Sequence, residues 1–531
     1  MAHLRLDTEI DFSALRTLLV RWSGARRIAE WFRVHGDLAA LTVVAVGFVV
    51  QIVATRDRSL SPDEALQVAM VNLPGLAGVY RNSQVNAHPP LFFLILHFWL
   101  RLGRSEFFLR LLPAIFGAAF LWFSRRWAGG LFGRTAGIMT LLLIAFAPAL
   151  LPLSAEVRGY SLLLLLSVSA LAEFENAVEA RSPARMVVFS LLLYLAILTH
   201  YGALFIMLSL FVYALARFWS SRLSDRVLTI WAGFQVGAAA LYLFLYVTQV
   251  SRLRGGPLEH QAMTGWLDTS YFHRDQETPV FFVVRQTAAV FRYFFGSPVA
   301  AAVGFFLAAA GVVHLALKRQ TSVLLVVLPF LFGAAAGLVG LYPFGGTRHS
   351  AYLLPFAAAA IGVAVSAFSA WRRWFVLLLF AALATLSRGT PAWSAPRQSL
   401  SAMNVAMDQL RRVVPAGSLL FTDFRTGAVL SYYLASDELH TERPGLDHFW
   451  ERDAGSYCLI RSPLWTPGPE SFSDEVERLI KVYRLPPGQR FWAIRSGWEY
   501  DLASALSRRF PGSVFPVLPR LRDMSIAEVW P

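Results

Sequence analysis

Five short polar segments of this 531-residue chain carry carboxylates, imidazoles and guanidiniums, each bordered by apolar sequence. They are Ser61-Pro62-Asp63-Glu64-Ala65, Asn86-Ala87-His88-Pro89-Pro90, Glu156-Val157-Arg158-Gly159-Tyr160, Thr199-His200-Tyr201 and Gly345-Gly346-Thr347-Arg348-His349-Ser350. A carboxylate can accept a proton, and arginine can hold a phosphate through two parallel hydrogen bonds. Ionisable residues at the edge of a membrane are costly enough to be functional candidates by default. Acid–base chemistry and anion binding are therefore expected in these segments.

The elements that position these segments are long apolar stretches. Crossing a hydrocarbon layer of about 30 Å takes about 17–25 residues, which predicts a polytopic α-helical membrane protein. Eleven spans are expected, at 38–54, 107–123, 135–153, 160–178, 186–199, 202–218, 227–249, 299–317, 322–342, 351–369 and 372–387.

The distribution of cations predicts the orientation. With residues 1–37 on the cytoplasmic side, the short inner loops hold twelve Lys and Arg in 35 residues, whereas the outer loops hold twelve in 117. This difference follows the positive-inside rule, so the expected external loops include 55–106 and 250–298. The N-terminal segment has no small-residue cleavage site after a short apolar core, which indicates an uncleaved anchor.

Two apolar stretches are excluded from the spans. Residues 89–102 are too few and begin with Pro-Pro, and residues 280–295 carry Arg285 and Arg292 on one helical face, which predicts an amphipathic surface helix. When these two stretches are not counted as crossings, all the segments that bear candidate residues lie on one side of the membrane.

From about residue 388 the composition becomes that of a soluble protein. Short strands are expected at 419–423, 457–461 and 491–495, and helices at 402–414, 426–435, 473–485 and 500–510. This alternation predicts an external α/β domain over 388–531, next to a membrane domain over 38–387. A lid or an acceptor-docking role is the preferred interpretation.

Composition narrows the class of protein. The chain is 56% hydrophobic and 15% charged with a formal charge of +14, and all its cations except Lys318 and Lys481 are arginine. A nucleic-acid partner is disfavoured because the cations are divided between the two sides of a membrane. The single cysteine, Cys458, excludes an internal disulfide framework and any Cys-based metal cluster.

Four of the segments occur in an order that resembles the dolichyl-phosphate-mannose protein mannosyltransferases, which are GT-C glycosyltransferases, and the bacterial relatives that modify lipid A. They are Asp63-Glu64 in the first external loop, His88-Pro89-Pro90-Leu91, Glu156 with Arg158 and Tyr160, and Thr199-His200-Tyr201. The resemblance covers about residues 55–215, extends more weakly to residue 370, and leaves out the C-terminal region.

The resemblance implies transfer of a sugar from a polyprenyl-phosphate donor to a protein, lipid or glycan acceptor outside a bacterial inner membrane. Asp63 matches the family's general base, and Glu156 stands where the family usually has Asp. Arg158, Arg348 and His88 are the candidates for the donor phosphate, with His88 cationic only when protonated. The remaining substrate-binding candidates are Glu64, Tyr160, His200, Tyr201 and His349.

Structural alternatives stay open for these residues. Asp63 could cap a helix, Glu156 and Arg158 could pair with each other, and Arg348 could extend to lipid headgroups. The sequence does not require a cofactor. The question of a divalent metal stays open: side chains that can bind a metal are present, but no close His-x-x-x-His spacing occurs.

Two other functions also remain open at this point. A transporter or flippase of a lipid-linked sugar would use arginines facing a cavity, although no internal repeat is evident. A receptor or assembly scaffold would act through the C-terminal region, and the Asp63 loop would then be dispensable.

Overall fold

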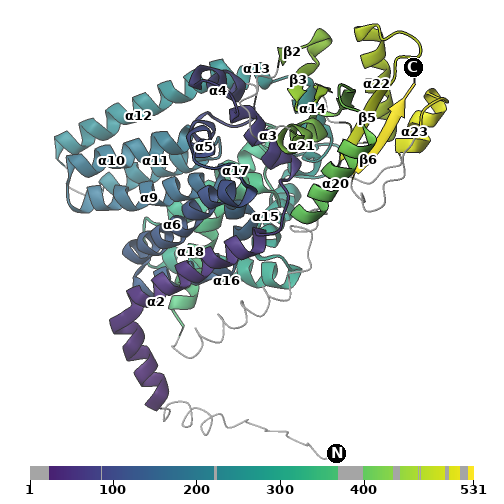
Figure 1. Ribbon diagram of the computed structural model, residues 1–531. Coiled ribbons are helices and arrows are strands. Elements are labelled where there is room, and N and C mark those ends of the chain that lie inside the picture. The colour runs from purple at the N-terminus through teal and green to yellow at the C-terminus, as the bar shows by residue number, and fades with distance from the viewer. Residues whose placement is uncertain are drawn as a thin grey trace, which may run out of the picture.

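The computed structural model describes residues 23–84, 86–219, 224–368, 399–434, 443–463, 466, 468–496, 502–514 and 524–530. Its larger part is a helical bundle, and a mixed sheet with helices lies at one end of it (Figure 1). The expected span 372–387 lies outside the described residues, as do the first 22 residues.

Apolar helices make up the bundle. They are α2 (Ser23–Thr55), α6 (Glu106–Phe132), α7 (Arg134–Phe146), α9 (Tyr160–Glu179), α10 (Pro183–Ile197), α11 (Ala203–Trp219), α12 (Asp225–Leu245), α16 (Pro298–Leu317), α17 (Val323–Leu338) and α18 (Leu354–Ser366). Among the described residues, six helices are long and apolar enough to cross a membrane, and several shorter apolar helices accompany them. The chain is thus an integral membrane protein, and ten of the expected spans coincide with helices.

Two details of the bundle differ from the sequence prediction. The expected span 135–153 is divided into α7 and α8 (Leu150–Ala155), with Ala147 in an extended conformation between them. Pro148 explains the break, because the residue before proline is disfavoured in the helical region. The expected inner loop 124–134 is mostly helical, since α6 continues to Phe132.

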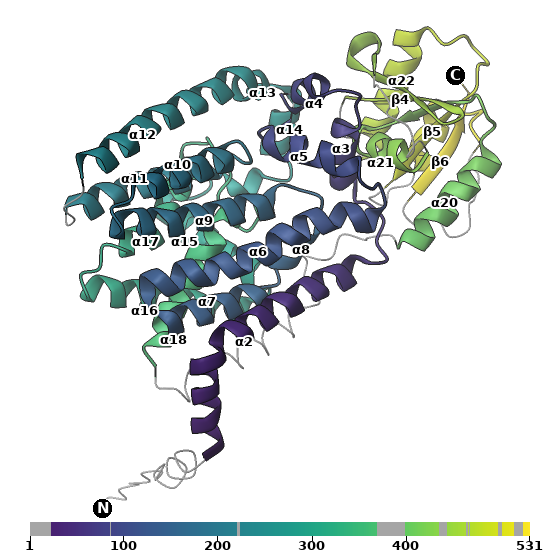
Figure 2. The same cartoon turned by 60° about the vertical axis from the view of Figure 1, so that its left-hand side comes forward.

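Short helices lie at the end of the bundle nearest the sheet. They are α3 (Pro62–Val71), α4 (Leu76–Ser83) and α5 (Leu91–Leu100), and Figure 2 shows them between the bundle and the C-terminal region. α5 has only 10 residues, which agrees with its exclusion from the spans. The second excluded stretch forms α15 (Pro279–Phe295), whose Phe282, Val290 and Phe294 are buried.

The segments that join α12 to α15, and α17 to α18, are irregular. After α12 the chain continues through a π-helical turn, η1 (Tyr246–Val250), into α13 (Ser251–Leu253), α14 (Pro257–Thr264) and the 3₁₀ turn η2 (Asp268–Ser270). A second 3₁₀ turn, η3 (Arg348–Leu353), leads directly into α18.

The C-terminal region contains a six-stranded sheet in the order β2-β3-β4-β1-β5-β6. The strands are β1 (Leu419–Thr422), β2 (Arg443–Pro444), β3 (Trp450–Ala454), β4 (Tyr457–Arg461), β5 (Phe491–Ser496) and β6 (Met524–Val529). The three central strands β4, β1 and β5 are parallel and are those expected from sequence, with Phe421 opposite Ile460 and Ala493. The outer strands pair antiparallel.

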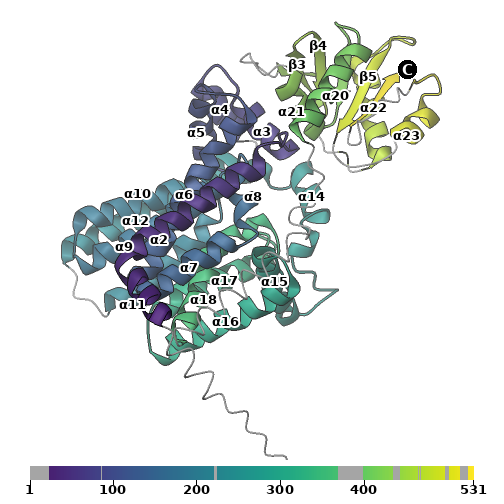
Figure 3. The same cartoon turned by 60° about the horizontal axis from the view of Figure 1, so that its bottom comes forward.

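Four helices accompany the sheet, close to the expected positions: α20 (Leu400–Val413), α21 (Phe424–Leu434), α22 (Pro469–Tyr483) and α23 (Leu502–Arg509). A 3₁₀ turn, η6 (Leu446–His448), precedes β3. α21 follows β1 directly and faces α3 of the membrane part (Figure 3).

Candidate active site

The first turn of α3 presents Asp63 and Glu64 in different directions. Ser61 is the N-cap: its hydroxyl accepts from the Glu64 N–H, and the Glu64 carboxylate accepts from the Ser61 N–H. This capping box satisfies the free N–H groups at the helix start. The helix is therefore capped by Ser61, which leaves the Asp63 side chain for other contacts.

Two guanidiniums converge on a single oxygen of Asp63. Arg158 Nη1 and Arg348 Nη2 each donate to Asp63 Oδ2 at 2.7 Å. Within the described residues, Oδ1 accepts no hydrogen bond, and the Asp63 side chain keeps 29% of its surface exposed. Asp63 is thus a paired carboxylate whose second oxygen has no hydrogen-bond partner in the described part of the chain. Arg158 pairs with Asp63 and not with its near neighbour Glu156, the partner weighed for it from sequence.

His88 helps to orient Arg158. Its Nδ1 lies 2.8 Å from the Ala87 carbonyl oxygen, which can only accept, so Nδ1 carries the proton. His88 Nε2 then accepts from Arg158 Nη2, 3.4 Å away. The Arg158 guanidinium also lies over the Tyr160 ring, 5.5 Å from its centroid.

Buried donors without partners surround this arginine. His200 Nδ1 accepts from the Gly202 N–H at 3.0 Å, so its proton is on Nε2. In the described part of the chain, His200 Nε2, the Tyr160 hydroxyl and Arg158 Nε have no hydrogen-bond partner, and the His200 ring lies 5.0 Å from those of His88 and Tyr160. Buried donors are normally paired, so these three groups have unused hydrogen-bonding capacity.

The Gly345-Gly346 pair allows Arg348 to reach Asp63. Gly345 has φ +155°, and a Cβ there would lie 2.3 Å from Gln286 Oε1 of α15. A Cβ at Gly346 would meet the Ala289 carbonyl oxygen at 2.8 Å. Because only glycine fits so close to α15, this turn brings η3, and with it Arg348, over the first turn of α3.

The charges of the site affect its titrating groups. Burial alone would raise the pKa of Asp63, but the guanidiniums of Arg348, Arg158 and Arg425 hold it well below its usual range. Burial, together with the charge of Arg158, lowers the pKa of His200 to about 3.

The other two histidines of the site behave in the same way. Burial lowers the pKa of His88 and of His349 well below the ordinary value, and nearby charges lower both further. His88 is therefore neutral near pH 7, and the expected pH-dependent charge on it is absent from this arrangement.

Glu156 and His349 lie beside the same cluster. The charge of Glu156 acts on Arg348, and its carbonyl accepts from the Arg158 N–H at 2.7 Å in the tight turn before α9. The His349 ring lies 6.2 Å from that of Tyr342, whose hydroxyl donates to the His349 carbonyl.

Glu64 and Tyr201 make contacts within the protein. Both oxygens of Glu64 accept two hydrogen bonds each, from Arg110, the Ser61 N–H and the Val157 N–H. The Tyr201 hydroxyl donates to Gln249 Oε1, whose amide donates to the Ser83 carbonyl. These hydrogen bonds tie Glu64 to α6 and to the turn before α9, and link Tyr201 through Gln249 to α4. Contact of the two side chains with substrate stays a prediction.

Sequence reasoning missed Arg110 and Arg425. Arg110 lies inside the apolar stretch of α6, where a buried cation is itself a signal of a specific partner. Arg425 comes from α21 of the C-terminal region, and no pattern in the sequence connects it with the Asp63 cluster. Among the described residues, no three His, Cys, Asp or Glu side chains gather as metal ligands.

The sequence matches one family model, and a search of curated proteins gives no match. Residues 87–248 match the model of the dolichyl-phosphate-mannose-protein mannosyltransferases.

Several solved structures share the fold. ArnT from Cupriavidus metallidurans in the apo state is 14% identical, with a TM-score of 0.53 over 93% of this chain and 98% of ArnT. The same protein bound to undecaprenyl phosphate gives 0.51 at 15% identity, over 93% of this chain and 98% of ArnT. The oligosaccharyltransferase of Archaeoglobus fulgidus in the apo form gives 0.50 at 13% identity, over 88% of this chain and 70% of that one.

This chain covers 63% of the oligosaccharyltransferase in its structure with a tethered acceptor peptide, where the TM-score is 0.44. At these identities the likeness is one of fold. The family match over residues 87–248 and the shared fold agree with the resemblance drawn from the motifs.

Proposed function

We propose that this chain transfers a sugar from a polyprenyl-phosphate-linked donor to an acceptor at the external face of the membrane, with Asp63 as general base. The family match over residues 87–248 supports glycosyl transfer, and ArnT, which shares the fold, has been solved with undecaprenyl phosphate bound. The transporter alternative receives no support from these comparisons.

One observation carries this proposal: among the described residues, a carboxylate that accepts both arginine hydrogen bonds on one oxygen lies beside buried donors without partners. The arginines can bind the phosphate of a donor, while His200 Nε2, the Tyr160 hydroxyl and Arg158 Nε supply hydrogen bonds to it or to the sugar. Asp63 Oδ1, which neither arginine contacts, is left for the acceptor hydroxyl.

The reaction follows from these positions. The acceptor oxygen forms a bond to the anomeric carbon as the bond from that carbon to the phosphate oxygen breaks, and the hydroxyl proton passes to Asp63. Phosphate is already a good leaving group, so no general acid is required. Attack from the opposite side inverts the anomeric centre without a covalent sugar intermediate.

The low pKa of Asp63 would make it a weak base in the free protein. Donor binding resolves this difficulty if the phosphate takes over hydrogen bonds of Arg158 and Arg348, because Asp63 then loses the charges that lower its pKa. The pKa of Asp63 therefore rises only when a donor is bound, so the acceptor is deprotonated only when a donor is present to react with it.

Glu156, whose charge acts on Arg348, is assigned to orient the acceptor or to assist in its deprotonation. His88 acts as a neutral acceptor that holds Arg158, and His349 follows Arg348 in η3. Neither histidine is assigned a charge in the mechanism.

Mass spectrometry of cell-surface glycans, lipids and glycoproteins tests the proposal. Cells lacking the gene are compared with cells that carry the wild-type chain or Asp63→Asn at equal abundance. We expect one modified acceptor with the wild-type chain and none in the other two. If Asp63→Asn restores the modification, Asp63 is not the base; if no glycan differs between any of the strains, the chain does not transfer sugar.

A further inference from the structure

The segment that leads into α3 has no regular secondary structure of its own. Residues 56–60 join the end of α2 to the N-cap Ser61 outside any helix or strand. The backbone groups of such a segment must be paired by other parts of the molecule where they are buried, and Leu60 is only 2% exposed. The position of the first turn of α3, and with it that of Asp63, therefore depends on the contacts that hold this segment.

The helical bundle holds the carbonyl groups of the segment through Arg110 of α6. The Arg110 guanidinium donates at 3.4, 2.6 and 2.8 Å to three successive acceptors, the carbonyl oxygens of Thr55, Arg58 and Ser59. It also donates to both oxygens of Glu64, at 2.9 Å each. One cation of the bundle thus fixes carbonyl groups on the way into α3.

The C-terminal region makes two further contacts with the same segment. At the start of α20, the Leu400 N–H donates to the Asp57 carbonyl oxygen at 3.3 Å. In α21, the Tyr433 hydroxyl accepts from the Leu60 N–H at 2.8 Å. This N–H lies just outside the capping box of Ser61, so its acceptor comes from the C-terminal region and not from the cap.

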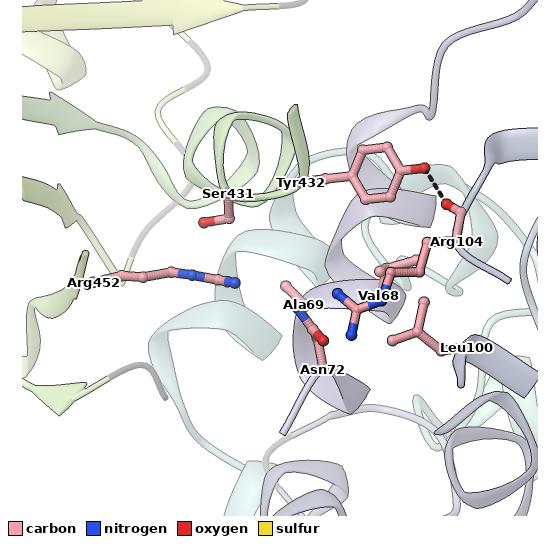
Figure 4. Close-up of a pocket in the computed structure, with 8 residues that line it drawn as sticks. All are labelled: Val68, Ala69, Asn72, Leu100, Arg104, Ser431, Tyr432 and Arg452. Carbon is pink, nitrogen blue, oxygen red and sulfur yellow. Dashed lines mark hydrogen bonds between the residues drawn. The ribbon is translucent and has the colours of Figure 1, made fainter. Parts of the chain in front are cut away.

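The neighbouring Tyr432 makes a different contact at the same interface. As Figure 4 shows, its hydroxyl donates to the Arg104 carbonyl oxygen, which lies 2.6 Å away, shortly before α6. The rings of Tyr432 and Tyr433 are nearly perpendicular, at 85°, with centroids 4.8 Å apart. Both hydroxyls join α21 to the membrane part, but it is the hydroxyl of Tyr433 that contacts the segment before Asp63.

We infer that Tyr433 is a positioning residue for glycosyl transfer, because its hydroxyl holds the Leu60 N–H and so fixes the start of α3 and the Asp63 carboxylate. This inference rests on the proposed function, in which Asp63 is the general base. A base must be held closely against its substrate, since misplacement by about 1 Å can lower a rate on the order of 10²-fold. The C-terminal region thus supports catalysis through a backbone contact three residues before the base.

Hydrogen exchange of the full-length protein in nanodiscs, followed by mass spectrometry, tests the contact itself. Tyr433→Phe keeps the ring but removes the acceptor of the Leu60 N–H, and Tyr432→Phe is the matched control. We expect peptides that cover residues 56–64 to exchange about tenfold faster in Tyr433→Phe and at the wild-type rate in Tyr432→Phe. Equal exchange in all three proteins, or an equal increase in both variants, would overturn the inference.

Turnover tests the link between Tyr433 and Asp63. Transfer is measured with a polyprenyl-phosphate sugar as donor and with the acceptor that the comparison of cell-surface glycans identifies. We expect Tyr433→Phe to lower kcat about tenfold, with the KM for the acceptor and the affinity for polyprenyl phosphate unchanged. Tyr432→Phe should keep the wild-type kcat.

The same assay separates this inference from the proposed function. If Asp63→Asn is inactive and Tyr433→Phe has the wild-type kcat, Tyr433 does not position the base and the proposed function stands. If Tyr433→Phe loses polyprenyl phosphate affinity as much as it loses kcat, its role is general stability, which also overturns the inference. If Asp63→Asn turns over as wild type does, the assignment of the base itself is wrong.

Discussion

Asp63 and Glu64 are adjacent in the first turn of α3, and arginine pairs with both, yet their surroundings differ. Glu64 has a side-chain exposure of 3%, and four donors fill its two oxygens. Asp63 has an exposure of 29% and places both arginines on Oδ2. Buried ion pairs by themselves are therefore poor markers of function. Unused hydrogen-bonding capacity distinguishes Asp63, the carboxylate proposed as the base, from Glu64, whose oxygens are fully used within the protein.

The largest effect should come from removing the charge of Asp63. Asp63→Asn keeps the size of the side chain but removes the base, and general-base catalysis typically contributes on the order of 10²–10⁴-fold in rate. We expect the rate of sugar transfer by purified protein to fall about 10³-fold, with the midpoint of thermal unfolding little changed. If Asp63→Asn turns over as fast as wild type, Asp63 is not the general base, and its free hydrogen-bonding capacity does not mark a catalytic carboxylate.

Breaking the neighbouring pair should give the opposite pattern. Arg110→Ala leaves Glu64 buried without its main partner, and removing one member of a buried ion pair costs about 3–5 kcal/mol. We expect a lower unfolding temperature and lower yield in detergent, with transfer per folded molecule reduced far less than in Asp63→Asn. Loss of turnover at unchanged stability would mean that Glu64 takes part in the reaction.

A subtler change separates charge from geometry at Arg348. Arg348→Lys keeps the positive charge but loses the planar fork, and a hydrogen bond to a charged group is worth about 1.5–3 kcal/mol. We expect the dissociation constant of the donor to rise about tenfold or more while the KM for the acceptor stays the same. Arg274→Lys, at an exposed position of the segment between η2 and α15, is the matched control and should change neither value.

The pH dependence of turnover tests whether donor binding raises the pKa of Asp63. In the free protein the arginines hold the pKa of Asp63 well below its usual range, so Asp63 becomes protonated only at unusually low pH. The acid limb of kcat/KM reports the free enzyme and should lie lower than that of kcat, which reports the donor complex. If the kcat limb lies at the same pH or below, donor binding does not release the arginines from Asp63.

The smallest effect is expected at Tyr201. Tyr201→Phe removes the hydrogen bond to Gln249, at a cost of about 1 kcal/mol in the free energy of unfolding. Donor affinity should not change, because this hydroxyl faces the scaffold. A loss of donor affinity at unchanged stability would return Tyr201 to the substrate-binding residues.

Sequence reasoning found the residues that apolar periodicity could locate. Asp63, Arg158 and Arg348 lie at the ends of long apolar stretches, so counting crossings was enough to put them on one side. The central strands β1, β4 and β5 were found because they are apolar and continuous. β3, with the sequence Trp-Glu-Arg-Asp-Ala, is an outer strand with too many charges to show such a pattern.

The remaining features depend on tertiary contacts that no local pattern encodes. Arg110 was hidden in an expected span, and its partner became evident only once α3 lay against α6. The position of Arg425 depends on how α21 docks on α3, which neither helix specifies alone. The difference between Asp63 and Glu64 likewise required the geometry of each hydrogen bond.

The hydrogen bond from Leu60 to Tyr433 joins residues 373 positions apart in the chain. A ribosome makes α3 early, but the helix that covers it is made only after nearly all the bundle has been synthesised. During that interval the first turn of α3 lacks this contact, and its charged groups lack their neighbour in α21. The order of synthesis therefore delays the contact between α3 and α21 until the C-terminal region has emerged.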